Sequence, residues 1–502
     1  MTALGYEFLR RSLPLQAFAP RLPAILKPVT RVEPTPTYLA VPSHVAPASD
    51  EPLQHILFAL KHEGVNLQIL AQALPHVPAQ ALVHELHRTP NGRYIRMACH
   101  LWESLTHQTL DATPAIGGSY ANLFDPRRYV TGPPQRDARW RINFNGLGTP
   151  RYCVTVERTP TIQAAINANV LQRANAFRET LGAGLMERTL AWAYLHETRD
   201  SFAIEREAPS EDKSRAFIAL LHQAHSKRAL TEDYLVELQA ATVSNPFDKA
   251  TAFRTEQNWL GGPARGAAGV TYLPPPPELA RELMDELMCL ANAAAGKLDP
   301  LVAAAVISFG FVYIHPFMDG NGRLSRFLFH QALCQSGQLA DGLVLPVSVA
   351  MKKHEAEYLR VLQIYSQPAR EFWRVTWLDN DNYHFDFLGD AAHSIYRYWD
   401  ATPCVEFGFA MAEQALNVEL RRETRFLARY DAIHAAVNER FDLRGSDLST
   451  LIVGCIENDN GISQRRRDQF SGRVPDTVFT FIEEMAVQTE RDCTDAAPSG
   501  PP

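Results

Sequence analysis

The chain is 502 residues long, more than one ordinary hydrophobic core accommodates, so two or three domains are expected. Apolar residues make up 46% and charged residues 21% of the sequence, as in soluble globular proteins. The net charge of -7 argues against a protein whose main partner is nucleic acid, because such proteins are usually basic.

The cysteines and the apolar runs predict the compartment. The 7 cysteines are widely spaced and include no Cys-x-x-Cys pair, which argues against a disulfide framework and a zinc site. The first residues lack the apolar core of a signal peptide, and the longest apolar run, 301–314, is too short to span a bilayer. We therefore expect a soluble, cytoplasmic protein with no membrane partner.

The N-terminal third divides into three stretches. Residues 1–50 are proline-rich, which predicts an extended arm that stays out of the core. Helical apolar spacing over 51–112 begins an N-terminal helical region, expected over 51–160. Residues 113–160 are rich in Gly, Pro and Asn and predict a long irregular connection with a short strand at 152–156.

Residues 161–365 are predicted to be mostly helical, with one interruption. Two short extended pieces joined by a Gly-rich turn predict a hairpin over 254–273, and four prolines then bar a helix until Glu278. The following apolar helix ends at His315.

The C-terminal region, 366–490, begins with an aromatic-rich stretch of unassigned structure. Helical spacing returns over 411–442, and 443–490 is consistent with a small helix-turn-helix or winged module. Arg465, Arg466 and Arg467 in that module predict either DNA binding or, more commonly, a solvated basic helix face. The tail 491–502 is expected to be disordered.

The segment 315–326, HPFMDGNGRLSR, holds the densest group of candidate functional residues. Gly320 and Gly322 flank Asn321 and permit positive φ angles and a close approach of backbone to a ligand. Apolar spacing after this turn predicts a helix. The turn therefore lies at a helix N-terminus, where free N–H groups and the helix dipole attract anions.

Four charged or titratable side chains complete this segment. Arg323 and Arg326 project to similar sides of the first helical turn and suit a di- or triphosphate. Asp319 beside a phosphate predicts a bridging Mg²⁺, and His315 can accept a proton from a hydroxyl group. Taken singly each feature is more often structural. Together, directly after an apolar helix, they favour a functional site.

The segment matches His-x-Phe-x-Asp/Glu-Gly-Asn-Gly-Arg-x-x-Arg, so the chain resembles Fic (Fido) proteins of the large bacterial type with an N-terminal inhibitory helix. The resemblance implies that His315 is the catalytic base, that Asp319 holds Mg²⁺ and that Phe317 anchors the loop. It also implies nucleotide binding by Asp319, Gly320, Asn321, Gly322, Arg323 and Arg326, with Arg326 on the γ-phosphate. The hairpin over 254–273 resembles the Fic flap, which holds the target segment as an added strand.

A second resemblance concerns an inhibitory helix near 195–207. Many Fic proteins carry Ser/Thr-x-x-x-Glu-Gly/Asn there, and Ser201 and Glu205 match the first two defined positions. This implies that Glu205 pairs with Arg326 and blocks the γ-phosphate. Arg206 departs from the expected Gly or Asn, whereas Glu207 resembles the N-terminal version of the motif.

The resemblance implies a mainly α fold. We expect a Fic-type helical core over 161–365 with a small β-hairpin flap, flanked by helical N-terminal and C-terminal (winged-helix-like) domains. Tyr358 is expected to form part of the adenine-binding wall with Leu359, although helical Tyr and Leu are more often core residues.

The activity implied is that of a protein adenylyltransferase. Such an enzyme moves AMP from ATP to a Ser, Thr or Tyr hydroxyl of a target protein, or of itself by auto-modification, with Mg²⁺. One alternative is a nucleotide-sensing regulator whose C-terminal module binds DNA or a partner. Another is a Fic variant that removes AMP or transfers other phosphate-containing groups.

Overall fold

The computed structural model describes residues 2–243, 245–379, 382–389 and 393–495. The chain divides into two compact units. The first comprises 1–169, 201–341 and 354–410, and the second comprises 170–200, 342–353 and 411–502. Helices predominate in both, as the sequence predicts.

The first fifty residues are folded, so the prediction of an extended arm outside the core is wrong. Leu4, Leu9, Ala24 and Val41 are buried, because the prolines leave short segments free to form a helix and to pair as strands. The elements are α1 (Gly5–Ser12), β1 (Ala24–Leu26), β2 (Glu33–Pro34) and β3 (Leu39–Val41), with sheet order β1-β3-β2.

Helices occupy most of the stretch 51–112 that was predicted to be helical, from Pro52 to Thr106. Its helices share one apolar core with residues of the following stretch. They are α2 (Pro52–His62), α3 (Leu67–Ala73), η1 (Leu74–His76), α4 (Ala79–Arg88) and α5 (Arg93–Thr106).

Residues 113–160 hold more strand than the single one predicted. Individually these strands are two to four residues long, too short to give an alternating apolar pattern. They form sheets β4-β6-β5 and β13-β8-β7, with the predicted strand at 152–156 present as β8. The strands are β4 (Ala121–Asn122), β5 (Gln135–Asp137), β6 (Ile142–Phe144), β7 (Leu147–Thr149), β8 (Tyr152–Thr155) and, far along the chain, β13 (Tyr398–Asp400).

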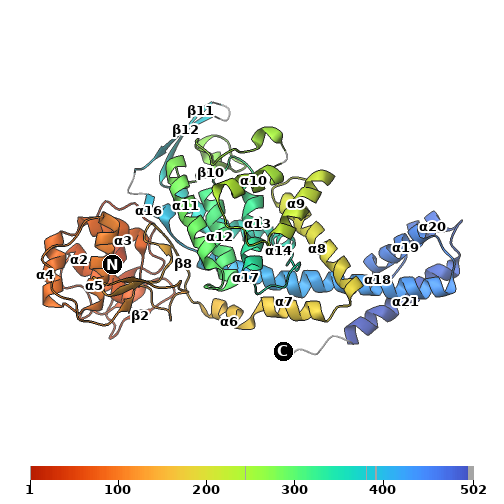
Figure 1. Cartoon of the computed structure of the whole chain (residues 1–502), viewed down its shortest axis with the longest axis horizontal. Helices are drawn as coiled ribbons and strands as arrows, with labels where there is room; N and C mark the ends of the chain where they lie inside the picture. Colours follow the sequence, from red (N-terminus) through yellow and green to blue (C-terminus); the bar gives the residue numbers. More distant parts are fainter. Residues whose placement is uncertain (1, 244, 380–381, 390–392, 496–502) are drawn as a thin grey trace. The chain divides into compact units, whose positions relative to one another are not determined.

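The motif lies in a helical core in which α13 packs against α12, α10 and α9 (Figure 1). Almost every residue of α12 is buried, which explains its continuous apolar sequence. The helices of this part are α6 (Pro160–Ala168), α9 (Glu211–Gln223), α10 (Glu232–Thr242), η2 (Pro246–Asp248), α11 (Pro277–Ala294), α12 (Pro300–Ile314), α13 (Asn321–Gln335), α15 (Glu355–Arg370) and α16 (His393–Arg397).

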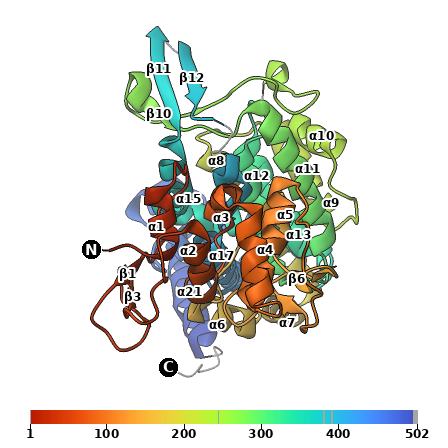
Figure 2. The ribbon, with the colours of Figure 1, turned by 90° about the vertical axis from the view of Figure 1, so that its left-hand side faces the viewer.

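The predicted hairpin before the motif is present as β9 (Leu260–Gly261) and β10 (Val270–Tyr272), an antiparallel pair joined through η3 (Gly266–Gly269). A second hairpin, β11 (Trp373–Asp379) and β12 (Asn382–Phe387), lies next to it (Figure 2). One apolar cluster that includes Val270, Trp373 and Phe385 joins the two hairpins. The aromatic residues of the unassigned 366–410 stretch thus cover the flap.

The second unit contains a compact helical module at its C-terminal end. Its core draws on Ile433, Val437, Leu451, Phe470 and Phe479. The elements of the unit are α7 (Val170–Glu179), most of α8 (Ala183–Ile204), α14 (Val347–Lys353), the end of α17 (Thr402–Gln414), the π-helical turn η5 (Ala415–Leu420), α18 (Arg421–Arg440), α19 (Gly445–Glu457), α20 (Gln464–Phe470) and α21 (Asp476–Asp495).

Two expectations for this module change. Residues 443–495 contain three helices and, as far as they are described, no strand that would form a wing. Helix α21 continues through 491–495, so the first part of the predicted disordered tail is helical, and 496–502 lie outside the described residues. Apolar residues such as Phe479 and Ile482 hold α21 in the core of the module.

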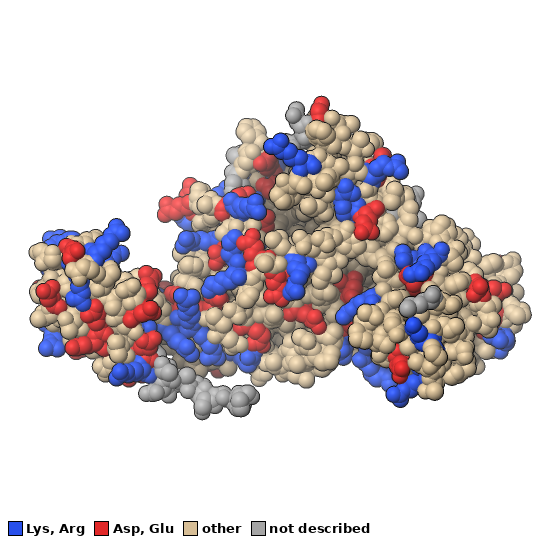
Figure 3. Space-filling model, turned by 180° about the vertical axis from the view of Figure 1, so that it is seen from behind, with Lys and Arg blue, Asp and Glu red and all other residues tan. Residues whose placement is uncertain are grey.

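The distribution of surface charge and the lengths of the helices agree with the expectations drawn from the sequence. Over the face shown in Figure 3, Lys and Arg are interspersed with Asp and Glu. Within the described ranges, every helix is too short or too polar to cross a bilayer.

Candidate active site

His315 lies where α12 ends. Asp299 caps the other end of this helix, because its carboxylate accepts hydrogen bonds from the backbone N–H groups of Leu301 (3.0 Å) and Val302 (3.2 Å). At the C-terminus His315 adopts a left-handed conformation, φ 53° and ψ 60°, and its N–H donates to the Phe311 carbonyl at 2.9 Å. A non-glycine residue is uncommon in this conformation and marks the site as locally constrained.

The His315 imidazole is held neutral with one nitrogen free to act as a base. Its Nδ1 lies 3.0 Å from the Val312 carbonyl oxygen. A carbonyl only accepts, so Nδ1 carries the proton and Nε2 carries the lone pair. Burial lowers the pKa of His315 to about 4, which keeps the ring neutral at physiological pH.

The turn after His315 is shaped by Asn321 and Gly320. The Asn321 amide clamps the backbone of Phe317, since Oδ1 accepts from the Phe317 N–H at 3.0 Å and Nδ2 donates to its carbonyl at 2.7 Å. Gly320 has φ 88°, and a Cβ there would come within 3.0 Å of Val243. Helix α13 therefore begins at Asn321, with the buried Phe317 anchoring the loop as predicted.

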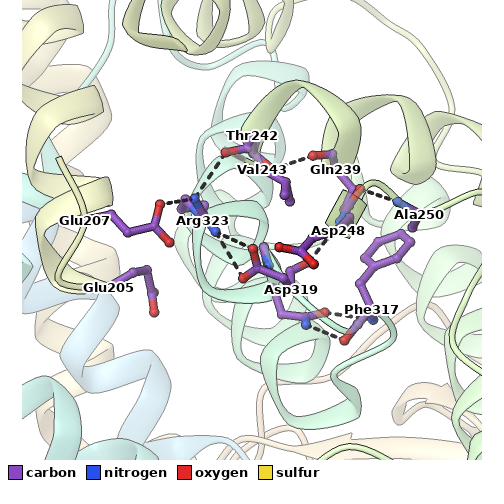
Figure 4. A network of polar contacts seen from close by, with 12 residues as sticks. Glu205, Glu207, Gln239, Thr242, Val243, Asp248, Ala250, Phe317, Asp319 and Arg323 are labelled. Carbon is purple, nitrogen blue, oxygen red and sulfur yellow. Dashed lines mark hydrogen bonds and ion pairs between the residues drawn. The ribbon is translucent and has the colours of Figure 1, made fainter. Parts of the chain in front are cut away.

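Arg323 is 1% exposed and is bound to two carboxylates. Nη1 donates to Glu207 at 2.7 Å and to the Thr242 carbonyl at 3.2 Å, and Nη2 donates to both Asp319 oxygens at 3.1 Å (Figure 4). Its guanidinium carbon lies 5.1 Å from the centroid of the Phe202 ring.

Arg326 is equally buried and is bound by the end of α8. Its Nε donates to the Ser201 hydroxyl at 2.9 Å, and Nη2 donates to the Ser201 carbonyl at 2.5 Å and to Glu205 at 2.9 Å. Burial lowers the pKa of Arg326, but the Glu205 carboxylate and the Tyr358 hydroxyl together outweigh this and the net pKa is raised. A Cβ on Gly322 would overlap the Glu205 carboxylate, so this carboxylate occupies the anion-binding start of α13.

The end of α8 explains how both carboxylates reach the arginines. Arg206 has φ 60°, the left-handed conformation that Gly or Asn adopts most easily at a helix end, and its N–H donates to the Ala203 carbonyl at 3.0 Å. Although Arg206 stands where the family pattern has Gly or Asn, the backbone at this position therefore adopts the left-handed conformation expected of those residues. The reversal turns Glu207 toward Arg323 (Figure 4). Glu205 stays paired with Arg326.

Asp319 is the one motif carboxylate available for a metal. Its side chain is 43% exposed, one oxygen accepts from the Gly320 N–H at 2.7 Å, and both accept from Arg323. Across the described residues no group of three or more His, Cys, Asp or Glu side chains suits a metal ion. A single carboxylate still fits Mg²⁺, which usually takes one or two carboxylates and completes its shell with phosphate oxygens and water.

Tyr358 and Leu359 lie on α15 in different environments. Tyr358 is 5% exposed and stacks on Phe407, with 5.7 Å between ring centroids. Burial raises the pKa of Tyr358, whereas its neighbour Arg326 acts to lower it. Leu359 is 47% exposed. Tyr358 thus supports Arg326 from the core side.

Arg254 is a residue of the site whose role the sequence does not indicate. Its Nε donates to the His315 carbonyl at 2.9 Å, its backbone N–H to the Pro316 carbonyl at 2.8 Å, and Nη2 to the Pro275 carbonyl at 2.5 Å. Burial lowers the pKa of Arg254 to about 10. One side chain therefore connects the base of the hairpin to the loop that begins at His315, and in the sequence only its position just before the hairpin suggests this.

The flap is attached to the motif at further points. The Asn258 amide donates to the Phe317 carbonyl at 2.9 Å, and the Tyr272 hydroxyl donates to the Tyr313 carbonyl at 2.5 Å. Within the described ranges, β9 and β10 pair only with each other, so each keeps an unpaired edge. Such an edge can accept an extended peptide as an added strand.

The structure also places the three arginines considered for DNA binding. Arg467 donates to Glu483 at 2.6 Å and to the Ile462 carbonyl at 3.2 Å, and Arg466 donates to Gln469 at 3.0 Å. Arg465 is exposed. Arg467 thus stabilises the module from within.

Comparison with known proteins finds a family match over one part of the chain, which includes the motif. Residues 229–333 match the model of the Fic/DOC family. The protein adenylyltransferase Fic of Aedes aegypti is 31% identical over 116 residues, which cover 23% of this chain and 20% of that protein. The protein adenylyltransferase fic-1 of Caenorhabditis elegans is 27% identical over 148 residues, which cover 29% of this chain and 26% of that protein. The chain thus spans at most about a quarter of these relatives.

Solved structures of Fic proteins also align with the chain. A Fic family protein from Desulfovibrio desulfuricans G20 aligns with a TM-score of 0.35 and 19% identity, over 68% of this chain and 94% of that chain. Fic-1 (residues 134–508) from C. elegans aligns with a TM-score of 0.34 and 16% identity, over 74% of this chain and 97% of that chain.

Proposed function

We propose that this chain, whose residues 229–333 match the model of the Fic/DOC family, acts as a member of that family and transfers AMP from ATP to a Ser, Thr or Tyr hydroxyl of a protein. The observation that carries the proposal is the placement of a neutral base, His315, beside a helix N-terminus that presents two buried arginines. The free thiols of the described cysteines support the expected location in the reducing cytoplasm.

His315 takes the proton in the proposed reaction. The target hydroxyl oxygen attacks the α-phosphorus of ATP, its proton passes to Nε2 of His315, and pyrophosphate leaves. The Nδ1 contact with the Val312 carbonyl fixes the ring and the tautomer needed for this transfer. Since the pKa of His315 is about 4, the base form is available throughout the neutral range.

The start of α13 binds the phosphates in this proposal. Its first backbone N–H groups, together with Arg323 and Arg326, neutralise the charge that develops on the leaving pyrophosphate. Asp319 would hold Mg²⁺, which would neutralise phosphate charge and orient the leaving group. Arg326 binds the γ-phosphate, with Tyr358 packed behind it.

The flap positions the target protein. An unpaired strand edge binds an extended segment through main-chain hydrogen bonds, which accommodates many sequences. Arg254 and Tyr272 hold the flap to the backbone of the catalytic loop and of α12. This attachment would keep the bound hydroxyl in line with the α-phosphate.

We further propose that the end of α8 inhibits the enzyme through two carboxylates. Glu205 pairs with Arg326 and covers Gly322, where phosphate oxygens would lie. Glu207 pairs with Arg323, the second phosphate-binding arginine. A phosphate must displace both carboxylates, so the resting site has low affinity for ATP in its productive position.

The activity test compares Glu205→Gly with Glu205→Gly/His315→Ala, using α-labelled ATP, Mg²⁺ and a cell lysate as the source of target. Loss of the base should lower the labelling rate by roughly 10²–10⁴-fold. His84→Ala, an exposed histidine on α4, serves as the matched control and should label normally. Equal labelling with and without His315 would refute the proposed transfer.

The inhibition test measures auto-labelling of two conservative variants. Glu205→Gln removes the carboxylate charge that pairs with Arg326 and should raise the rate of auto-labelling by about tenfold or more. Glu207→Gln should raise it by about two- to fivefold, because Arg323 keeps Asp319 as a partner. Glu187→Gln, an exposed change on the same helix, should have no effect. Unchanged rates in both Glu205→Gln and Glu207→Gln would rule out the inhibitory role.

A further inference from the structure

The second unit contains a pocket of about 390 Å³ that belongs to no part of the proposed active site. Four of its lining residues are arginines of α18, namely Arg421, Arg422, Arg425 and Arg429. The π-helical turn η5, which ends where α18 begins, adds Asn417 and Val418 to the wall. π-helical turns are rare and occur frequently at functional sites.

The pocket has an excess of positive charge. Glu490 is its one lining carboxylate, so the formal charge of the wall is four minus one, or +3, in a chain whose net charge is -7. Among the residues that the structure describes, no carboxylate lies within 4.0 Å of any of the four guanidinium groups. The Glu490 carboxylate instead accepts a hydrogen bond from the Asn460 amide.

Neutral contacts hold two of the arginines in place. The guanidinium carbon of Arg421 lies 5.1 Å from the centroid of the Phe177 ring, and Arg429 donates to the Ala486 carbonyl at 3.0 Å and to the Asn460 side chain. Arg422 and Arg425 are exposed and make no hydrogen bond with any described residue. The wall therefore has two positioned guanidinium groups and two that are free to move onto a ligand.

Helix energetics disfavour this row of arginines when the pocket is empty. Arg421 and Arg425 are four residues apart, as are Arg425 and Arg429, and like charges at this spacing destabilise a helix. An anion in the pocket would relieve this repulsion. One guanidinium group can donate two parallel hydrogen bonds to the oxygens of one phosphate. Several guanidinium groups therefore suit a ligand with several phosphate groups.

We propose that this pocket binds a small polyphosphate, such as a nucleoside triphosphate or an inorganic polyphosphate. The volume lies in the range of small-molecule sites. The arginines would take the phosphates, while Phe426 and Ile456 provide an apolar wall for an organic group. The pocket is formed entirely by the second unit, so it is a second anion site in addition to the start of α13.

The test uses the full chain carrying Arg323→Gln, which removes phosphate contacts from the active site. Sodium tripolyphosphate is titrated by calorimetry into this background and into the same background with Arg422→Gln/Arg425→Gln. One saturable site should appear in the background and weaken by tenfold or more in the pocket variant. Arg465→Gln/Arg466→Gln makes the same charge change on α20 and should leave the site intact.

Further arms identify the ligand and guard against misfolding. Tighter binding of ATP than of tripolyphosphate would identify a nucleotide ligand, and equal binding would identify a polyphosphate; either result supports the site. The pocket variant should keep or raise the thermal midpoint, since its like-charge repulsion is reduced. Equal affinity in the pocket variant, no saturable binding, or binding of a DNA duplex in place of tripolyphosphate would overturn the proposal.

Discussion

The molecule contains two groups of arginines that differ in whether carboxylates of the chain pair with them. Arg323 and Arg326 in α13 are each 1% exposed and are paired with carboxylates of the chain itself. Arg422 and Arg425 in α18 are exposed, and no described carboxylate pairs with them. Burial explains the difference, because a buried cation without a partner is strongly destabilising, whereas water solvates an exposed one.

The difference shows what each site requires before a ligand binds. At α13 Glu205 and Glu207 pair with the two buried arginines. In the proposed mechanism these carboxylates occupy positions that a phosphate would take, so the contacts that stabilise the arginines would also inhibit the enzyme. At α18 the exposed arginines need no internal partner, and the pocket stays open to an anion. On these two proposals, the buried anion site contains carboxylates of the chain that compete with the ligand, whereas the exposed site needs none.

The largest effect is expected from removing one buried guanidinium group. In the Glu205→Gly background, Arg323→Gln should lower the rate of AMP transfer by roughly 10²–10³-fold, because a preorganised donor to the phosphates is lost. Arg215→Gln is the matched control. Arg215 also lies near two carboxylates, Glu211 at 3.5 Å and Asp212 at 3.8 Å, but it is exposed on α9. Comparable losses in both variants would show that burial does not set the two kinds of arginine apart.

A smaller effect concerns pH, to which guanidinium groups are insensitive. The fold lowers the pKa of His315 from 6.5 to about 4, so its stabilising contribution is complete above pH 6.5 and is lost as the pH falls toward 4. Between pH 7 and pH 4, wild type should lose about 3 kcal/mol more unfolding free energy than His315→Asn. Chemical denaturation at both pH values measures this, and parallel losses would contradict a buried neutral imidazole.

The smallest effect concerns how α8 presents its carboxylates to the buried arginines. Arg206 occupies a left-handed conformation that costs an ordinary residue about 1 kcal/mol or more. Arg206→Gly should raise the free energy of unfolding by about 1 kcal/mol and lower auto-labelling, because the end of α8 becomes firmer. Arg206→Ala removes the same side chain but keeps a Cβ, so the strain of the left-handed backbone conformation remains. An equal gain in that variant would mean that strain at this position is unimportant.

The motif and its surrounding helices were predictable because their signals are local. Glycines that permit positive φ, an apolar run before the turn and helical spacing after it all lie within about thirty residues. The flap hairpin was predictable for the same reason, from extended pieces and a Gly-rich turn. The pairing of Glu205 with Arg326 followed from resemblance, and the contact at 2.9 Å agrees with it.

The parts that the sequence did not predict depend on pairing and packing between segments that are not adjacent in the chain. The strands in 1–50 and 113–160 are two to four residues long, too short for a periodic pattern. They form because other strands complete their hydrogen bonds, and for β8 one of these is the remote β13. The sequence of the hairpin β11–β12 shows only an aromatic-rich stretch without a clear pattern. In the structure its aromatic side chains pack against the flap. Arg254 looks like an ordinary charged residue, and its role appears only where three backbone carbonyls converge on it.

The sequence by itself determined the catalytic loop, the helices on either side of it and the chemistry they favour, because these depend on backbone conformation and residue type over short distances. The tertiary structure alone decided which charges meet. It placed Glu207 on Arg323, buried His315 so that its ring stays neutral, and left the arginines of α18 without carboxylate partners among the described residues. Burial and the approach of remote segments set these energies, and neither is encoded in local spacing.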